Sequence, residues 1–65
     1  MQILVNGDRH EVEPDTLAAA LTALGFGGRK IATALNGDFV PAGMRQGTRL
    51  TDGDRIEVVA PIQGG

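Results

Sequence analysis

The fold is decided by the stretch MQILVNGDRHEVEP at residues 1–14. Within residues 1–5 the odd-numbered positions are all large and apolar, which predicts a half-buried strand with those side chains inward. Asn6-Gly7 then predicts a two-residue hairpin, because a type I′ turn needs positive φ at both central positions. We therefore expect a second strand over 9–13 to pair with the first, with Val12 on the core face.

A helix follows this hairpin. Pro14 stops the pairing of the strand before it. Asp15 or Thr16 can accept the free N–H groups of a first helical turn, so we expect a helix over about 16–24. Gly25 is placed to end it in the left-handed conformation. Leucines spaced i, i+4 and i+7 give the helix one apolar face, and they are Leu17, Leu21 and Leu24.

The second half of the chain reads as three more strands. We expect strands over 31–35 and 39–40 joined by a second Asn-Gly turn at 36–37, and a last strand over 55–60 that begins after the turn 52–54. In the last strand Ile56, Val58 and Ala60 should face the core. Residues 42–51 between these strands read as irregular, with Leu50 as a core anchor.

Five strands and one helix predict an α+β domain in which the helix covers one face of the sheet. The helix can be the crossover that lets the last strand lie parallel to the first, with both as central strands. This arrangement is a ubiquitin-like β-grasp with a mixed five-strand sheet. We expect the β-grasp domain over 1–60 and a flexible Gly-Gly tail over 61–65.

Composition excludes several classes of function. The chain has 65 residues, a net charge of −2 and no cysteine. Thiolate metal sites, disulfides and a cysteine nucleophile are therefore excluded. A nucleic-acid or anionic-membrane binder needs a basic excess, so we expect neither partner. No apolar run is long enough to span a bilayer, and the first residues have no signal-peptide pattern, so we expect a cytoplasmic protein.

The sequence carries no recognisable catalytic constellation. His10 lies among the carboxylates of Asp8, Glu11 and Glu13, and this grouping is compatible with a metal cluster or an acid–base pair. Alternation assigns Asp8 and His10 to the outer face of a hairpin strand, so we interpret His10 as a solvated histidine and expect no metal site and no catalytic residue. The stretch 25–30 fails the phosphate-loop pattern, because Ile31 follows Lys30 and the stretch runs from helix to strand. Arg29 and Lys30 instead suit the negative end of the helix dipole, and they could also contact an acidic partner.

The last segment points to a different kind of function. No charged side chain follows Glu57, and Pro61 lacks the N–H that sheet pairing needs. The four residues after Pro61 extend to about 14 Å at most. Gly64 and Gly65 have no side chains, so this end can enter a narrow channel and its carbonyl is open to attack from several directions.

The chain resembles the thiamine-biosynthesis sulfur carrier proteins. The resemblance spans essentially the whole chain, and its most specific motif is the Gln-Gly-Gly end at 63–65. The structural motifs that carry it are Asn6-Gly7, Thr16-Leu17, Leu24-Gly25, the stretch IATALNG at 31–37 and the stretch LTDGDRIEVV at 50–59. The opening residues also look like those of ubiquitin, which supports the fold rather than the function.

This resemblance implies a function. The carboxylate of Gly65 would be adenylated with ATP by a partner of the ubiquitin-activating type and converted to a thiocarboxylate by a sulfur donor protein. A thiazole synthase would then take the sulfur for thiazole formation. The carrier would bind no cofactor, would be a protein cosubstrate rather than an enzyme, and would act as a monomer. Main-chain capture would recognise Ile62, Gln63 and Gly64, and Leu4 and Val59, apolar on the outer sheet face, would form a partner-binding patch with Ile62.

Other interpretations remain open at this point. Pro61-Ile62 before Gln63 departs from the family and is similar to the small subunit of molybdopterin synthase, a related sulfur carrier. A β-grasp interaction module with a frayed end would bind partners through its sheet alone. A ubiquitin-like modifier would be joined to lysine side chains.

Overall fold

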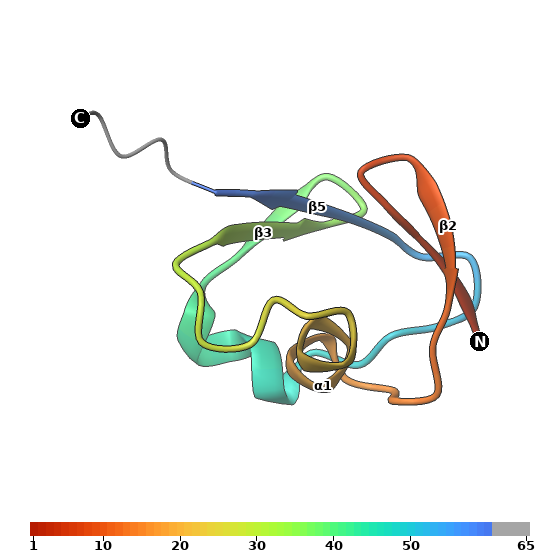
Figure 1. Cartoon of the computed structure of the whole chain (residues 1–65). Helices are drawn as coiled ribbons and strands as arrows, with labels where there is room; N and C mark the ends of the chain where they lie inside the picture. Colours follow the sequence, from red (N-terminus) through yellow and green to blue (C-terminus); the bar gives the residue numbers. More distant parts are fainter. Residues whose placement is uncertain (61–65) are drawn as a thin grey trace.

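The computed structural model describes residues 1–60, which fold into five strands, one α-helix and one 3₁₀-helix (Figure 1). In chain order these are β1 (Gln2–Val5), β2 (Asp8–Glu11), α1 (Leu17–Ala23), β3 (Ala32–Leu35), β4 (Asp38–Val40), η1 (Ala42–Gly47) and β5 (Arg55–Val59). The predicted boundary between a domain over 1–60 and a tail over 61–65 stays a prediction, because the tail lies outside the described residues.

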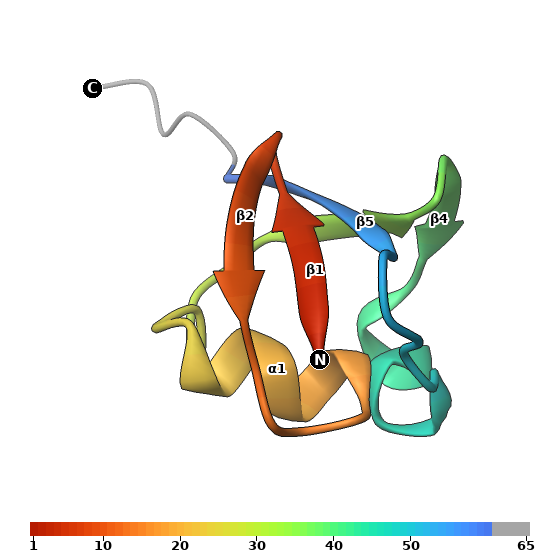
Figure 2. The same ribbon diagram turned by 90° about the vertical axis from the view of Figure 1, so that its right-hand side faces the viewer.

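The strands form one mixed sheet in the order β2-β1-β5-β3-β4. The pairing of β1 with β5 is parallel, whereas β1 with β2, β3 with β4 and β3 with β5 are antiparallel. Figures 1 and 2 show α1 lying against one face of this sheet, with η1 beside it. The predicted α+β class, the parallel first and last strands and the β-grasp arrangement are confirmed.

Both predicted hairpin turns are present. Asn6 and Gly7 have φ of 51° and 87°, and Asn36 and Gly37 have φ of 50° and 91°. Positive φ at both central residues is what a type I′ turn requires, and asparagine followed by glycine tolerates it best. The two turns therefore fix the strand registers on either side of β5.

The register of β1 with β2 corrects the expected position of His10. The two-residue turn pairs Val5 with Asp8 and Ile3 with His10. Directly opposed residues of an antiparallel pair share a face, so Asp8 and His10 lie on the face of Ile3 and Val5 rather than on the outer face. His10 is half-buried there. The same alternation leads on to Val12, which is buried as expected.

Helix α1 begins and ends through the predicted chemistry. Thr16 is the N-cap, and its Oγ1 accepts a hydrogen bond from the Ala19 N–H at 3.2 Å. At the other end Gly25 has φ of 95°, and the N–H groups of Gly25 and Phe26 donate to the carbonyls of Thr22 and Leu21. This pair of bonds is a Schellman motif, which satisfies carbonyls that the helix itself leaves free.

The core lies between α1 and the sheet. Leu17 and Ala20 of α1 are fully buried against Ile3 of β1 and Ile56 of β5, and Leu50 anchors the connection before β5 as predicted. Burial of one such large aliphatic side chain contributes about 1.5–3 kcal/mol. Ala60 is exposed rather than inward as expected, because the strand ends at Val59 and the alternation ends with it.

The stretch expected to be irregular contains the 3₁₀-helix η1. Pro41 precedes it in an extended conformation, and the Met44 N–H donates to the Pro41 carbonyl at 2.9 Å. At its end the Thr48 hydroxyl donates to the Met44 carbonyl at 2.7 Å. Short i to i+3 helices need no apolar period, so the sequence pattern did not indicate it. Neither α1 nor η1, the helices of residues 1–60, has the length and apolar character needed to cross a bilayer.

Candidate functional site

Strand β5 is held on both sides up to its last residues. On one side Val59 pairs with Ala32 of β3. On the other side β1 has ended at Val5, and the side chain of Asn6 continues the pairing in its place. Its Oδ1 accepts from the Val58 N–H at 2.8 Å, and its Nδ2 donates to the Val58 carbonyl at 3.0 Å. The backbone is therefore fixed immediately before the predicted tail.

The start of β5 has a similar clamp from the second hairpin turn. The Asn36 Oδ1 accepts from the Arg55 N–H at 2.9 Å, and its Nδ2 donates to Asp54 Oδ1 at 3.0 Å. Asp54 also accepts from the N–H of Thr51 at 2.8 Å and from its hydroxyl at 3.1 Å. The Thr51 backbone bond, together with the side-chain bonds from Asn36 and Thr51, lowers the pKa of Asp54 against a partial desolvation that raises it.

Apolar side chains gather on the outer sheet face near the end of β5. Val59 is 63% exposed and Phe39 of β4 is 70% exposed. A shallow depression between them is lined by Ala32, Ala34 and Glu57. Phe39 was not singled out from the sequence, although the Asn36-Gly37 turn sets Ala34 opposite Phe39 and so signals its face.

The structure separates the two described residues of the predicted patch. Leu4 is half-buried and pairs with Arg55 at the start of β5. Val59 lies four residues further along the strand, about 13 Å away at the rise of an extended chain. Leu4 and Val59 therefore lie at opposite ends of β5. Ile62, Gln63, Gly64 and Gly65 lie outside the described residues.

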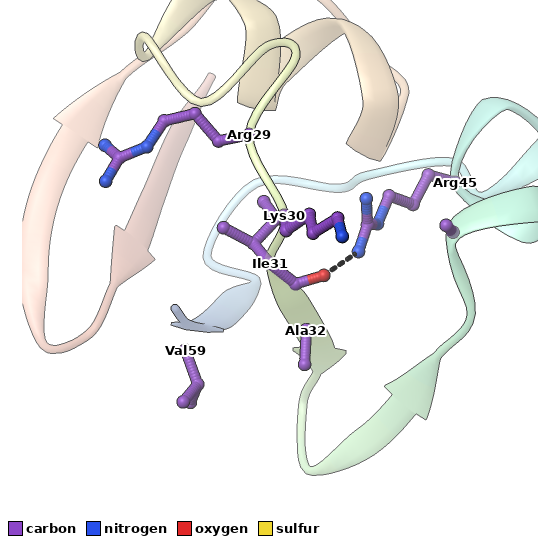
Figure 3. Close-up of a pocket in the computed structure, with 7 residues that line it drawn as sticks. Arg29, Lys30, Ile31, Ala32, Arg45 and Val59 are labelled. Atoms are coloured by element: carbon purple, nitrogen blue, oxygen red, sulfur yellow. Dashed lines mark hydrogen bonds between the residues drawn. The ribbon is translucent and has the colours of Figure 1, made fainter. Parts of the chain in front are cut away.

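A hollow of about 480 Å³ adjoins the end of β5 (Figure 3). Its floor is apolar, from Ile31, Ala32, Ala42 and Val59, and its rim carries Arg29, Lys30 and Arg45. Arg45 is held in place, since its Nη2 donates to the Ile31 carbonyl at 2.7 Å and its Nε donates to Thr33 Oγ1 at 3.0 Å. Thr33 is buried and donates its own hydroxyl to the Val40 carbonyl at 3.0 Å.

The described residues anchor the end of β5 and form surfaces beside it that another protein could contact. Among residues 1–60 no three His, Asp or Glu side chains are grouped as ligands for a metal ion. The geometry that stands out is a last strand, hydrogen-bonded on both sides, that ends beside an exposed apolar face and a basic hollow. Such an arrangement suits a protein that presents the chain after β5 to another protein.

Comparison with known proteins identifies relatives of the whole chain. The sequence model of the ThiS family matches residues 3–65. The crystal structure of the thiamine biosynthesis protein ThiS from Geobacter metallireducens is 26% identical in sequence, has a TM-score of 0.83, and both chains are covered completely. A solution NMR structure of a thiamine biosynthesis protein from the same organism has a TM-score of 0.77 at 26% identity, covering all of this chain and 88% of that one.

A curated relative is much longer than this chain. It is a thiazole synthase from Paramagnetospirillum magneticum, 35% identical over 66 residues. The match covers all of this chain and 20% of the thiazole synthase, so the chain spans about a fifth of that protein's length.

Proposed function

The chain belongs to the ThiS family of thiamine-biosynthesis sulfur carriers, and we propose that it carries sulfur as a thiocarboxylate on Gly65. The single observation that carries this proposal is the family match, which runs through the Gln-Gly-Gly end to residue 65. The described fold supports it, because β5 is clamped up to Val58 and Val59 and so gives the six residues that follow Val59 a fixed origin.

Loading requires activation, because a carboxylate is a poor electrophile. In the proposed first step an oxygen of the Gly65 carboxylate attacks the α-phosphorus of ATP, and pyrophosphate leaves to give the acyl-adenylate. The terminal sulfur of a protein persulfide then attacks the Gly65 carbonyl, and AMP leaves. The product is an acyl disulfide that joins Gly65 to the donor cysteine. A second thiol attacks the sulfur of that cysteine, which releases the thiocarboxylate and leaves a disulfide on the donor protein.

The catalytic groups for these steps come from other proteins in this proposal. The chain has no cysteine to hold a persulfide. Its glycine-rich stretch after α1 runs into β3 and does not form a strand-to-helix phosphate loop. We therefore assign ATP binding to an adenylyltransferase of the ubiquitin-activating type and regard this chain as a protein cosubstrate. Because Gly64 and Gly65 have no side chains, those enzymes can approach the Gly65 carbonyl closely.

Delivery is proposed to a thiazole synthase. The relative from Paramagnetospirillum magneticum is itself named a thiazole synthase and contains a stretch similar to this entire chain, which supports a functional link between the two activities. Partner contact would combine main-chain capture of Ile62, Gln63 and Gly64 with side chains of the body. Val59 is the stronger body candidate, because it is 63% exposed whereas Leu4 is half-buried.

A delivery assay tests this function. The thiocarboxylate form of the chain is mixed with thiazole synthase and the other substrates of that enzyme, and both thiazole product and intact carrier mass are followed. We expect loss of the carrier sulfur to match thiazole formation. A matched reaction with molybdopterin synthase large subunit and its precursor is the control. Sulfur transfer there, with none to thiazole, would overturn the thiamine assignment while leaving a sulfur carrier.

A further inference from the structure

The hollow beside Val59 has the composition of a recognition site. Arg29 and Lys30 are exposed at its rim, while Ile31 and Arg45 are half-buried. Figure 3 shows the Lys30 and Arg45 side chains extending toward each other in this view, whereas the Arg29 side chain extends in the opposite direction. The Arg29 guanidinium carbon lies 6.0 Å from the centre of the Phe26 ring. The Arg45 guanidinium is oriented by its bonds to Ile31 and Thr33, so part of this positive charge is fixed in position.

The charge of this rim is unbalanced. The chain has six basic residues and a net charge of −2, yet three of the six line this one hollow, and no carboxylate of residues 1–60 lines it. Among residues 1–60 the ion pair joins Arg49 to Asp15 on another part of the surface, at 2.6 Å. The rim therefore favours a partner group of negative charge that reaches over an apolar floor.

The negative group could be an acidic side chain of the partner protein or a phosphate of ATP, and the position of the hollow distinguishes between them. Its floor includes Val59, the last residue of β5, whereas Gly65 is six residues further along the chain. The span available to the four residues after Pro61 is at most about 14 Å, so a partner that receives Gly65 in a channel meets the body of the carrier at the channel mouth. A phosphate of ATP would lie at the reacting carbonyl, at the far end of that channel.

We propose that the Arg29, Lys30 and Arg45 rim binds an Asp or Glu side chain, flanked by an apolar residue, at the mouth of the enzyme that adenylates Gly65. This inference rests on the proposed function, because it needs a partner that receives the chain end. The rim would steer the encounter and fix the rotation of the carrier about its tail, while the apolar floor of the hollow would exclude water from the contact.

Charge-reversed carriers test the inference. Association of the chain with its adenylyltransferase is measured by stopped flow at about 20 mM and about 300 mM salt, first without nucleotide and then with ATP. We expect Arg29→Glu and Lys30→Glu each to lower the association rate constant about fivefold at low salt, with a smaller difference at high salt. Arg49→Glu is the matched control, because it changes net charge equally at an exposed arginine away from the hollow, and we expect it to change the rate less than about twofold.

Three results would overturn the inference. Arg29→Glu and Lys30→Glu could both associate like the wild type, Arg49→Glu could slow association equally, or the effect could appear only with ATP bound, which would identify a phosphate as the ligand. Intact mass of the wild-type chain after loading separates the two proposals. A wild type that never gains sulfur contradicts the proposed function and this inference with it. A loaded wild type with unaffected variants contradicts the inference alone.

Discussion

The side chain of Asn6 pairs with the backbone of Val58 as a neighbouring strand would. Its amide accepts from the Val58 N–H at 2.8 Å and donates to the Val58 carbonyl at 3.0 Å. Asn6 is also one of the two positive-φ residues of the first hairpin turn. One residue therefore turns the β1–β2 hairpin and fixes the end of β5.

We expect Asn6→Gly to loosen the end of β5 without disturbing the turn, because glycine adopts the same positive φ. Loss of two hydrogen bonds should cost about 1–2 kcal/mol of unfolding free energy in urea titrations. The Val58 amide should exchange with deuterium faster. Asn36→Gly is the matched control, since it removes the equivalent bonds at the start of β5. It should accelerate deuterium exchange of the Arg55 amide rather than of the Val58 amide. Equal exchange at Val58 in all three proteins would contradict this role.

Acid should destabilise the fold through Asp54. Its folded pKa lies below the ordinary value of 3.8, mainly because the Thr51 N–H donates to the carboxylate. The unfolded chain therefore takes up this proton first as pH falls. The stabilisation by Asp54 is complete above the ordinary pKa and is lost as pH falls through the folded pKa.

The check is urea denaturation of the wild type and Asp54→Asn at several values of pH. We expect the advantage of the wild type at neutral pH to shrink below about pH 4. Parallel stability profiles of the two proteins down to the lowest pH would refute the assignment to Asp54.

Thr33 and Arg45 should be energetically coupled. Thr33 Oγ1 accepts from Arg45 Nε and donates to the Val40 carbonyl, both at 3.0 Å, in a buried position. A double-mutant cycle of Thr33→Val and Arg45→Met should give a coupling of about 1 kcal/mol in unfolding free energy. The cycle of Thr33→Val with Arg49→Met is the control and should be additive. Additivity in both cycles would mean that the bond adds nothing to stability.

Exposed apolar area at the end of β5 should matter for partner binding rather than folding. We expect Val59→Ser to weaken binding to the adenylyltransferase about tenfold, which is about 1.4 kcal/mol. Unfolding free energy should fall by less than about 1 kcal/mol. Met44→Ser on η1 truncates a side chain of similar exposure, 61% against 63%, and should leave binding unchanged. Equal effects of the two substitutions would remove Val59 from the interface.

Local chemistry explains what could be predicted from the sequence. Asn6-Gly7 and Asn36-Gly37 determine their turns by backbone preference alone, and Gly25 ends α1 for the same reason. The alternation of apolar residues in β1 and β5 identified the core face, because one face of each strand packs against α1. These features need no knowledge of distant contacts.

Other features could not be predicted from the sequence, because they depend on contacts between distant parts of the chain. His10 is a different case, because the two-residue Asn6-Gly7 turn pairs it with Ile3 and alternation gives it the same face as Val12, so its inward position follows from local sequence. Arg45 reaches Ile31 and Thr33 from a 3₁₀-helix that has no sequence period. The basic hollow combines residues of two distant segments, so only the folded chain brings them together.

Mass spectrometry of the intact chain tests the central claim most directly. The protein is incubated with its adenylyltransferase, ATP and a persulfide donor, beside a variant that lacks Gly65 and a reaction without ATP. The account predicts that one oxygen is replaced by sulfur in the full chain only, and that fragmentation assigns the sulfur to Gly65. Sulfur gained equally by the variant that lacks Gly65, or a full chain that never changes mass, would contradict it.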